Sequence, residues 1–304
     1  MIIKNSSRLK PGVPSEELAA LLEGIGAEKL RGSVAYLAEP RHHFLNEAKN
    51  RAMADWLVSV LSKWGYRVSL EGEYRNVVAL PQRACEEVIL VGAHHDSVAQ
   101  TPGADDNASA VAALLGCALL CSLWSAELPV IFVAFNCEED GLLGSREFVA
   151  GYVRERGLKI RTTHILEMVG YADHREGSQI VPPGLPIKLP TRGDFLGLLA
   201  NQKAARAMNE VLQTARTYAP NLPVVGLEVL FGLEKYFPVL QRSDHAPFWA
   251  EGMPAIMWTD TSEFRNPHYH ASSDTADTLD YAFLQKVTQV LTACVISEAD
   301  TLVD

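Results

Sequence analysis

The 304-residue sequence predicts an α/β fold in which a mostly parallel sheet is covered by helices on both faces. Two kinds of segment support this prediction. The runs EVILV at 87–91 and PVIFVAFN at 129–136 are almost wholly apolar, as is typical of strands buried on both faces. Segments with helical spacing of apolar residues separate such runs, and strands that alternate with helices pair in parallel through crossover connections.

The individual elements follow from the spacing of apolar residues and from the turn residues between segments. The clearest helix covers 47–64, where Met53, Leu57 and Leu61 recur at intervals of four. In chain order, the expected helices are 16–37, 47–64, 108–124, 144–156, 202–218 and 281–299. The expected strands are 66–70, 76–80, 87–91, 129–136, 160–168 and 255–258.

The chain shows no internal repeat and no low-complexity tract, so we expect a single domain over 1–304. Residues 1–28 are expected to form a helical N-terminal extension. Residues 171–193 are rich in Pro and Gly with little periodicity, which predicts a long loop over the site. Loops of this length in compact domains are often functional.

Composition excludes several classes of partner. The formal net charge is −10, and neither Lys nor Arg is massed into a run that would neutralise phosphates, which argues against nucleic acid and anionic membranes. No segment reaches the ~18 to 20 consecutive apolar residues of a membrane span. Nothing at the start resembles a signal peptide, so a cytoplasmic protein is expected. A secreted protein whose leader had been removed would have the same sequence.

The five cysteines are an odd number without a disulfide framework, and they are expected to be reduced core thiols. Cys117 and Cys121 lie four residues apart on an expected helix. A metal clip would use that spacing, but no His or second Cys pair completes one, so the core interpretation is preferred.

Polar side chains follow the predicted strands at the points where these end. His94 and Asp96 come directly after EVILV, and they point in the same direction if the strand continues. Glu138 and Glu139 follow PVIFVAFN, and Glu167 lies near the end of 160–168. In parallel sheets, ligands gather beyond the carboxyl ends of the strands.

Two further segments supply groups of the same kind. The stretch TPGADDNAS places Asp105 and Asp106 side by side before an alanine-rich helix, and a later loop carries His268 and His270. Each group alone has a structural explanation, because acids after a strand often begin or cap a helix. Their coincidence at three strand ends and a later loop favours a metal centre, since zinc and related cations prefer oxygen and imidazole ligands.

Six segments, in order and spacing, resemble the M28 family of zinc metallopeptidases over residues 28–299. They are AHHDS, PGADDNAS, NCEEDGLLGS, LEMVGY, SDHAPF and NPHYHASSDTADTLD. The resemblance implies a three-layer α/β/α sandwich with a mixed, mostly parallel central sheet. It also implies a zinc-dependent hydrolase that removes amino-terminal residues from peptides.

The family's site residues carry over onto matching positions. The resemblance implies two zinc ions, one held by His94 and Glu167, the other by His270 and Glu139, with Asp106 bridging both. It assigns the role of general base to Glu138. It also implies that Asp96 orients the His94 ring by contacting the ring nitrogen that does not bind metal. Asp105 or Asn107 then shapes the turn that presents Asp106. His95 and His268 lie beside proposed ligands, and His95 is expected to point to the opposite face of the extended chain.

Two residues depart from the family pattern, and the first of them bears on the metal. Glu167 stands where most members have aspartate, and it belongs to the ion that single-zinc glutaminyl-cyclase relatives lack. A single-zinc, glutaminyl-cyclase-like aminoacyl transferase is therefore one alternative. A non-catalytic binding module on the same scaffold is a second, although such proteins tend to lose ligands or the base. Ala110 also replaces a common glycine, which is expected to change only the packing of the helix start.

Substrate-binding residues are less sharply defined. His245 is expected either to line the cleft and donate to the developing oxyanion or to cap the next helix. An apolar pocket for the substrate side chain is expected from Tyr236, Phe237, Phe248 and the loop 171–193. The partner is a peptide with a free amino terminus.

Overall fold

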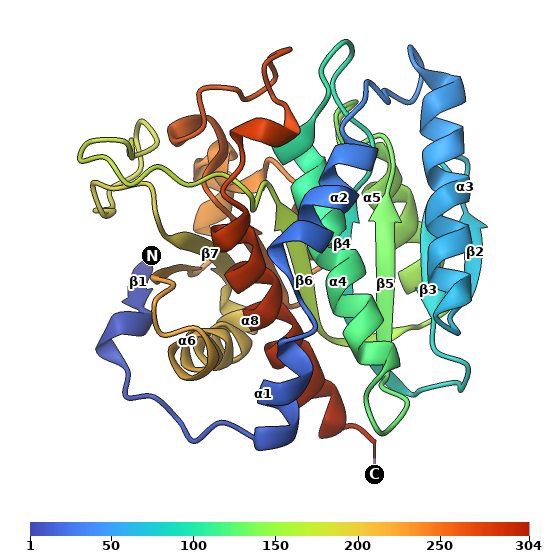
Figure 1. The fold of residues 1–304 in the computed structure, drawn as a ribbon, viewed down its shortest axis with the longest axis horizontal. Helices are drawn as coiled ribbons and strands as arrows, with labels where there is room; N and C mark the ends of the chain where they lie inside the picture. The colour runs from blue at the N-terminus through green and yellow to red at the C-terminus, as the bar shows by residue number, and fades with distance from the viewer. Residues whose placement is uncertain (304) are drawn as a thin grey trace.

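A nine-stranded mixed sheet forms the centre of the computed structural model, which describes residues 1–303 (Figure 1). The strands are β1 Ile2–Asn5, β2 Arg67–Glu71, β3 Asn76–Leu80, β4 Glu87–His94, β5 Val130–Phe135, β6 Lys159–Glu167, β7 Leu196–Asn201, β8 Val224–Val229 and β9 Ala255–Thr259. Their order in the sheet is β1-β8-β7-β9-β6-β4-β5-β3-β2. The predicted α/β class is confirmed.

The parallel part of the sheet lies at its centre. The strands β9, β6, β4 and β5 are parallel neighbours, as are β7 and β8, whereas the other four pairs are antiparallel. Every residue of β5 is buried, as is nearly all of β4, which explains their continuous apolar sequences. The carboxyl ends of β5, β4 and β6 therefore lie side by side at one edge.

Helices cover both faces of this sheet (Figure 1). They are α1 Glu16–Leu22, α2 Ala27–Leu37, α3 Glu47–Lys63, α4 Ala110–Ser122, α5 Leu143–Glu147, α6 Ala205–Tyr218, α7 His245–Ala250 and α8 Tyr281–Asp300. Alternate strand residues enter two separate cores. Val77 belongs to the core that contains apolar residues of α1 to α4, α6 and α8, whereas Val78 belongs to the core that contains residues of α7 and of the π-helical turn Phe148–Arg154. The sheet and the helices on its two faces form the predicted three layers.

The N-terminal segment differs from its prediction in two ways. The expected helix 16–37 is interrupted between α1 and α2, where Gly24 and Gly26 lie. Glycine loses more conformational freedom than other residues on entering a helix, so the break falls where helix propensity is lowest. The helical extension expected for 1–28 is also wrong at its start, because β1 pairs with β8 at the edge of the sheet.

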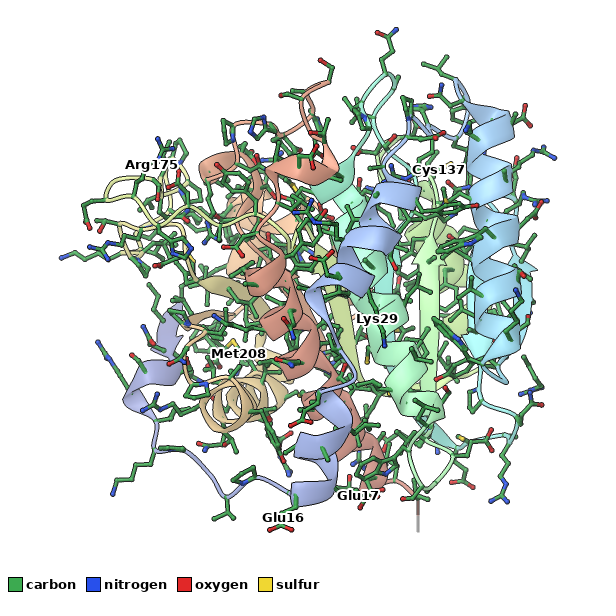
Figure 2. All side chains as sticks on the ribbon, viewed as in Figure 1. Glu16, Glu17, Lys29, Cys137, Arg175 and Met208 are labelled. Atoms are coloured by element: carbon green, nitrogen blue, oxygen red, sulfur yellow. The ribbon has the colours of Figure 1, made fainter. Side chains whose placement is uncertain are left out.

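The strands β1, β7 and β8 were not expected from the sequence. β7 and β8 each contain a glycine, at 197 and 226, which weakens the β-strand signal. Gly226 has a packing reason: a Cβ there would lie 2.8 Å from Sδ of Met208, on α6 (Figure 2). Glycine at this position therefore lets α6 pack on the sheet without a shift of the Met208 side chain.

The loop 171–193 contains no helix or strand and is closed at its base by a bridge between Asp173 and Gly193. It extends away from the body of the molecule, with Arg175 at its outer part (Figure 2). One helical stretch of the described residues, Ala104–Ser122, is long and apolar enough to span a membrane, but 89% of its most apolar window is buried inside the fold. We assign it to the core.

Candidate metal centre

The proposed ligands come together at the carboxyl edge of the parallel strands. His94 is the last residue of β4, Glu167 is the last residue of β6, and Glu139 follows β5 by four residues. Because β5, β4 and β6 are parallel neighbours, their ends present these side chains to one place.

The first group of ligand atoms surrounds the His94 ring. Its Nε2 lies 3.3 Å from Oδ1 of Asp106 and 3.4 Å from Oε2 of Glu167. The opposite ring nitrogen, Nδ1, lies 3.3 Å from Oδ1 of Asp96. The imidazole therefore faces two carboxylates with one nitrogen while a third carboxylate holds its other side.

The second group lies around His270, in the loop before α8. Its Nε2 lies 3.1 Å from Oδ2 of Asp106 and 3.3 Å from Oε2 of Glu139. Asp106 thus directs one carboxylate oxygen to each imidazole. This is the arrangement expected of a carboxylate that bridges two cations.

The residues at this centre fit zinc. Buried polar atoms normally have hydrogen-bond partners, yet Nε2 of His94, Oδ1 of Asp106 and Oε1 of Glu139 have none. Carboxylate oxygens and imidazole nitrogens are ligands that zinc accepts, and tetrahedral bonds of about 2.0 to 2.1 Å place ligand atoms roughly 3.3 Å apart. The observed separations of 3.1 to 3.4 Å match that spacing.

The centre is strongly electronegative, and the pKa values of its groups reflect this. Burial lowers the pKa of His270, but the carboxylates of Asp106 and Glu139 outweigh it and raise the pKa to about 10. Burial also lowers the pKa of His94, and the charges of Glu138 and Glu167 raise it well above its usual value. Without metal, protons neutralise the excess of carboxylates; a bound cation would take their place.

Glu138 lies beside the metal centre, but farther from the His94 ring than the proposed ligands do. Its Oε2 lies 3.9 Å from Nε2 of His94. Burial, opposed by His94 and reinforced by Glu167, raises its pKa well above the usual value. A buried carboxyl with a raised pKa is suited to accepting a proton near neutral pH.

Asp96 connects the His94 ring to the chain that carries the two glutamates. Its Oδ1 accepts a hydrogen bond from the backbone N–H of Glu138 at 3.2 Å, and its Oδ2 accepts one from the backbone N–H of Glu139 at 3.3 Å. Carboxylates of this kind fix ring orientation and raise ligand basicity. Asp96 therefore sets the relative position of three site residues.

The adjacent acids of TPGADDNAS have separate tasks. Asp106 faces both imidazoles, whereas Asp105 accepts hydrogen bonds from the backbone N–H of Gly170 at 2.9 Å and from Nδ2 of Asn266 at 2.7 Å. Asn107 joins this turn to the end of β6, since its amide donates to the Leu166 carbonyl at 3.0 Å. Both neighbours of Asp106 thus hold the turn that presents it.

Three residues that support the site were not singled out from the sequence. The fully buried guanidinium of Arg41 donates to the carbonyls of His95 at 2.7 Å and Gly103 at 2.9 Å. Asp274 accepts hydrogen bonds from the backbone N–H groups of Asp105 and Asp106 at 2.9 and 3.1 Å. Ser243 Oγ donates to Oε2 of Glu167 at 2.7 Å. Asp274 and Ser243 lie inside recognised motifs, whereas no pattern marks Arg41.

Three histidines near the motifs do not join the centre. The ring of His95 is fully buried, and burial lowers its pKa to about 4; Nδ1 of His268 contacts Oγ of Ser273 at 2.9 Å instead. The ring of His245 is fully buried and its Nε2 lies 2.9 Å from the Leu240 carbonyl, a position that favours the structural alternative over the substrate contact. Its role is to join that carbonyl to the start of α7.

An apolar cavity of about 900 Å³, counted with its open mouth, adjoins the centre and includes Glu167 and Ser243 in its wall. The loop 171–193, the strands β7 and β8 and the segment before α7 supply its apolar side chains, including Leu185, Ile187, Leu189, Leu199, Leu227 and Leu240. The expected pocket residues Tyr236, Phe237 and Phe248 do not line it. Tyr236 is exposed and Phe248 is fully buried in the core.

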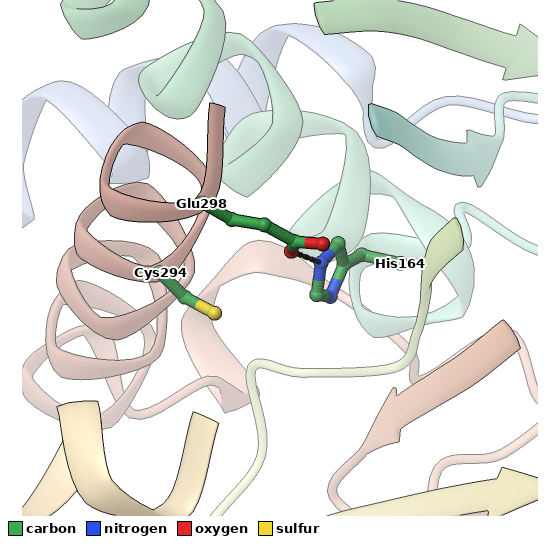
Figure 3. Close-up of side chains that lie close together, drawn as sticks. All are labelled: His164, Cys294 and Glu298. Carbon is green, nitrogen blue, oxygen red and sulfur yellow. Dashed lines mark hydrogen bonds and ion pairs between the residues drawn. The ribbon is translucent and has the colours of Figure 1, made fainter. Parts of the chain in front are cut away.

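A second group of potential ligands, His164, Cys294 and Glu298, lies between β6 and α8 (Figure 3). Nδ1 of His164 accepts a hydrogen bond from Nε1 of Trp258 at 3.2 Å, so the ring proton is on Nε2, which lies 3.5 Å from Glu298. Glu298 also accepts from Thr162 at 2.7 Å. Because these polar groups satisfy one another, we assign this group a structural role.

Cys117 and Cys121 agree with the core interpretation. Both are buried on α4, and their sulfurs are 4.0 Å apart. Cys137 and Cys294 are buried as well, whereas Cys85 is half-buried, so the core interpretation holds for four of the five cysteines; all five are free thiols in the described chain.

The nine-stranded sheet carries carboxylates and the His94 imidazole at its parallel strand ends, and His270 joins them from a nearby loop. This combination of fold and site is typical of a class of metal-dependent enzymes. Comparison with family models identifies the particular family: the model for peptidase family M28 matches residues 76–295. The chain therefore belongs to peptidase family M28, and the predicted membership is confirmed.

Several relatives show how widely the similarity extends. The uncharacterized protein YfbL of Escherichia coli (strain K12) is 35% identical over 285 residues, which cover 87% of this chain and 85% of that protein. Aminopeptidase YwaD of Bacillus subtilis (strain 168) is 28% identical over 213 residues, 69% of this chain and 40% of its own length.

Solved structures share the fold. The LapA aminopeptidase of Legionella pneumophila has a TM-score of 0.73 at 20% identity, over 96% of this chain and 78% of its own. The glutaminyl cyclase of Porphyromonas gingivalis has a TM-score of 0.67 at 20% identity, over 90% of this chain and 99% of its own. Both are too distant in sequence to show more than the architecture.

Proposed function

We propose that this chain is a zinc-dependent aminopeptidase that uses two zinc ions. The observation that carries the proposal is the position of Asp106, whose two oxygens face His94 and His270, each of which also faces a glutamate. Membership in a peptidase family and the aminopeptidase names of the relative YwaD and of LapA support the reaction.

The chemistry divides between metal and protein. Zinc held by His94, Glu167, Asp106, Glu139 and His270 would supply Lewis-acid chemistry, making water more acidic and polarising the scissile carbonyl. Glu138 takes the proton from the attacking water and passes it to the leaving amine. It can do so because it is not needed as a metal ligand. Asp96 keeps the His94 ring and the backbone of Glu138 in fixed relation during this transfer.

The surroundings of the centre favour a substrate with a free amino terminus. Carboxyl oxygens outnumber imidazole nitrogens at the site, and Oε1 of Glu139 is buried without a hydrogen-bond partner, so the N–H donors of an α-amino group find an acceptor there. The apolar cavity beside Glu167 offers room for the first side chain.

A single-zinc glutaminyl cyclase is the second candidate, because a glutaminyl cyclase shares the fold over 99% of its length. Glu167 argues for the two-ion scheme, since its Oε2 is 3.4 Å from Nε2 of His94 and completes a ligand set for a second ion. A cyclase would need only the set formed by Asp106, Glu139 and His270.

The decisive experiment combines metal analysis with product analysis. We expect the zinc-loaded protein to hold two ions per chain, to hydrolyse leucine p-nitroanilide and to lose this activity on chelation. One ion per chain together with pyroglutamate formation from an N-terminal glutamine peptide would replace the proposal with the cyclase. Zinc-loaded protein without either activity would favour a binding module.

A further inference from the structure

The cavity beside the metal centre has one charged pair in an otherwise largely apolar wall. Arg242 and Glu263 both line it, and Nη1 of Arg242 forms an ion pair with Oε1 of Glu263. The other titratable groups in the described wall are Glu167, which belongs to the metal centre, and Tyr269. The net charge of the pocket beyond the metal centre therefore depends on this pair.

The pair is fixed to the metal centre through Tyr269. Nη2 of Arg242 donates to the Tyr269 hydroxyl at 2.9 Å, and the Tyr269 ring stacks on the ring of His270 with centroids 3.8 Å apart. Arg242 is thereby held at a defined place between the proposed ligand His270 and the apolar wall.

We propose that the Arg242–Glu263 pair determines specificity by keeping the substrate pocket neutral, so that the enzyme selects peptides whose first side chain is large and uncharged. This inference rests on the proposed aminopeptidase function. A charged side chain that enters an apolar cavity loses hydration, and the paired Arg242 and Glu263 offer it no net opposite charge. An apolar side chain has no such hydration to lose, and it gains contact with the leucine-rich wall.

The proposal predicts opposite results for the two halves of the pair. Glu263→Gln leaves Arg242 unpaired, so kcat/KM for glutamate p-nitroanilide relative to leucine p-nitroanilide rises about tenfold, the effect of one unit charge in a half-exposed wall. Arg242→Gln leaves Glu263 unpaired, so the lysine-to-leucine ratio rises by a similar factor. The double variant R242Q/E263Q restores a neutral wall, and both ratios return to within about threefold of the starting protein.

Matched controls come from an exposed ion pair on α6. Arg206 and Glu210 are 2.9 Å apart and do not line the cavity, so Glu210→Gln and Arg206→Gln change the net charge equally and leave both ratios unchanged. Dissociation constants of free leucine, glutamate and lysine, measured by calorimetry on the zinc-loaded variants, give the same comparison if a variant loses turnover.

The outcomes separate this inference from the proposed function. Ratios that move less than twofold in both single variants, or that move equally in the α6 controls, would overturn the role of the pair while hydrolysis of leucine p-nitroanilide persists. Absence of hydrolysis in the unmodified protein contradicts the proposed function instead, and the amino-acid dissociation constants still decide whether Arg242 and Glu263 set the charge preference of the cavity.

Discussion

At the scale of single residues, the centre depends on unusual backbone conformations beside its functional groups. Cys137, Met168 and His270 have φ values of 56°, 47° and 53°, in the left-handed region that non-glycine residues seldom adopt. They lie directly before Glu138, directly after Glu167, and at a proposed ligand itself. Such conformations cluster at functional sites, where the surrounding structure holds them in place.

The adjacent residues Glu138 and Glu139 differ in what they face, and their substitutions should differ accordingly. We expect Glu138→Gln to lower kcat by about 10² to 10⁴-fold, because the amide accepts no proton from water. Zinc content, measured by atomic absorption, should not change. The exposed Glu155 gives a matched control, E155Q, with normal turnover. Near-normal activity of Glu138→Gln would remove this residue from the role of base.

Glu167 should control the number of ions. Its side chain faces His94 but not His270, so Glu167→Ala should reduce bound zinc from two ions to one per chain. The remaining ion should stay with Asp106, Glu139 and His270, which an anomalous-scattering crystal structure at the zinc edge would show. Two ions bound as tightly as in the unmodified protein would exclude Glu167 as a ligand.

At the scale of elements, side-chain contacts hold the connection between β4 and α4 in addition to its backbone hydrogen bonds. Besides its contacts to His95 and Gly103, Arg41 donates to the Pro102 carbonyl at 2.5 Å. Gly103 has a φ of 60°, and a Cβ there would lie 2.3 Å from the Asp106 carbonyl oxygen. The connection therefore has one geometry, and that geometry places Asp106.

Removing the Arg41 guanidinium should loosen this connection and weaken metal binding. We expect Arg41→Met to lower zinc affinity about 10 to 100-fold, the usual effect of losing a group that orients ligands. Each buried carbonyl left without a donor costs about 1 to 3 kcal/mol of stability. Arg41→Lys should restore little, because one ammonium does not reproduce a planar fork of donors. Zinc titration with a competing chelator measures the affinity, and an unchanged value in both variants would contradict this role.

At the scale of the whole molecule, the sheet is the scaffold that joins distant parts of the chain. Its parallel centre brings the ends of β4, β5 and β6 together, and the loop before α8 adds His270 from the far end of the sequence. Charges of one sign accumulate there, so the folded protein without metal has to bind protons at its own centre.

This coupling predicts the pH dependence of metal removal. The pKa of His270 is raised to about 10, so the protonated imidazole stabilises the metal-free fold. This stabilisation is complete below about pH 6.5, the pKa of an unfolded histidine, and it is lost as pH rises through 10. Zinc needs unprotonated imidazoles, so its affinity rises over the same range. The difference in Tm between zinc-loaded and metal-free protein should therefore be larger at pH 8.5 than at pH 6.

Proton release provides a second measurement of the same effect. Calorimetric zinc titration at pH 8 in two buffers with different ionisation enthalpies should show protons released from His94 and His270. A binding enthalpy that does not depend on the buffer would contradict the raised pKa values of these residues.

Much of this organisation is determined locally, which is why the sequence predicts it. The apolar runs of β4 and β5 identify buried strands, and residues directly after a strand must lie at its end. The spacing of α3 and α8 identifies amphipathic helices in the same way. The strands β7 and β8 gave a weaker signal, because each contains a glycine, which lowers strand propensity.

The α/β class follows from the amino-acid sequence, because it depends on the short-range spacing of apolar residues and turns. The residues that meet at the metal centre follow from the resemblance of six motifs to the M28 family. The packing of distant elements sets which nitrogen of His94 faces which carboxylate, that His245 is enclosed, and that Arg41 holds the turn before Asp106. It also brought Arg242 and Glu263 into one cavity wall. These relations depend on side chains far apart in the chain, whose distances are fixed only when the sheet and its covering helices pack together.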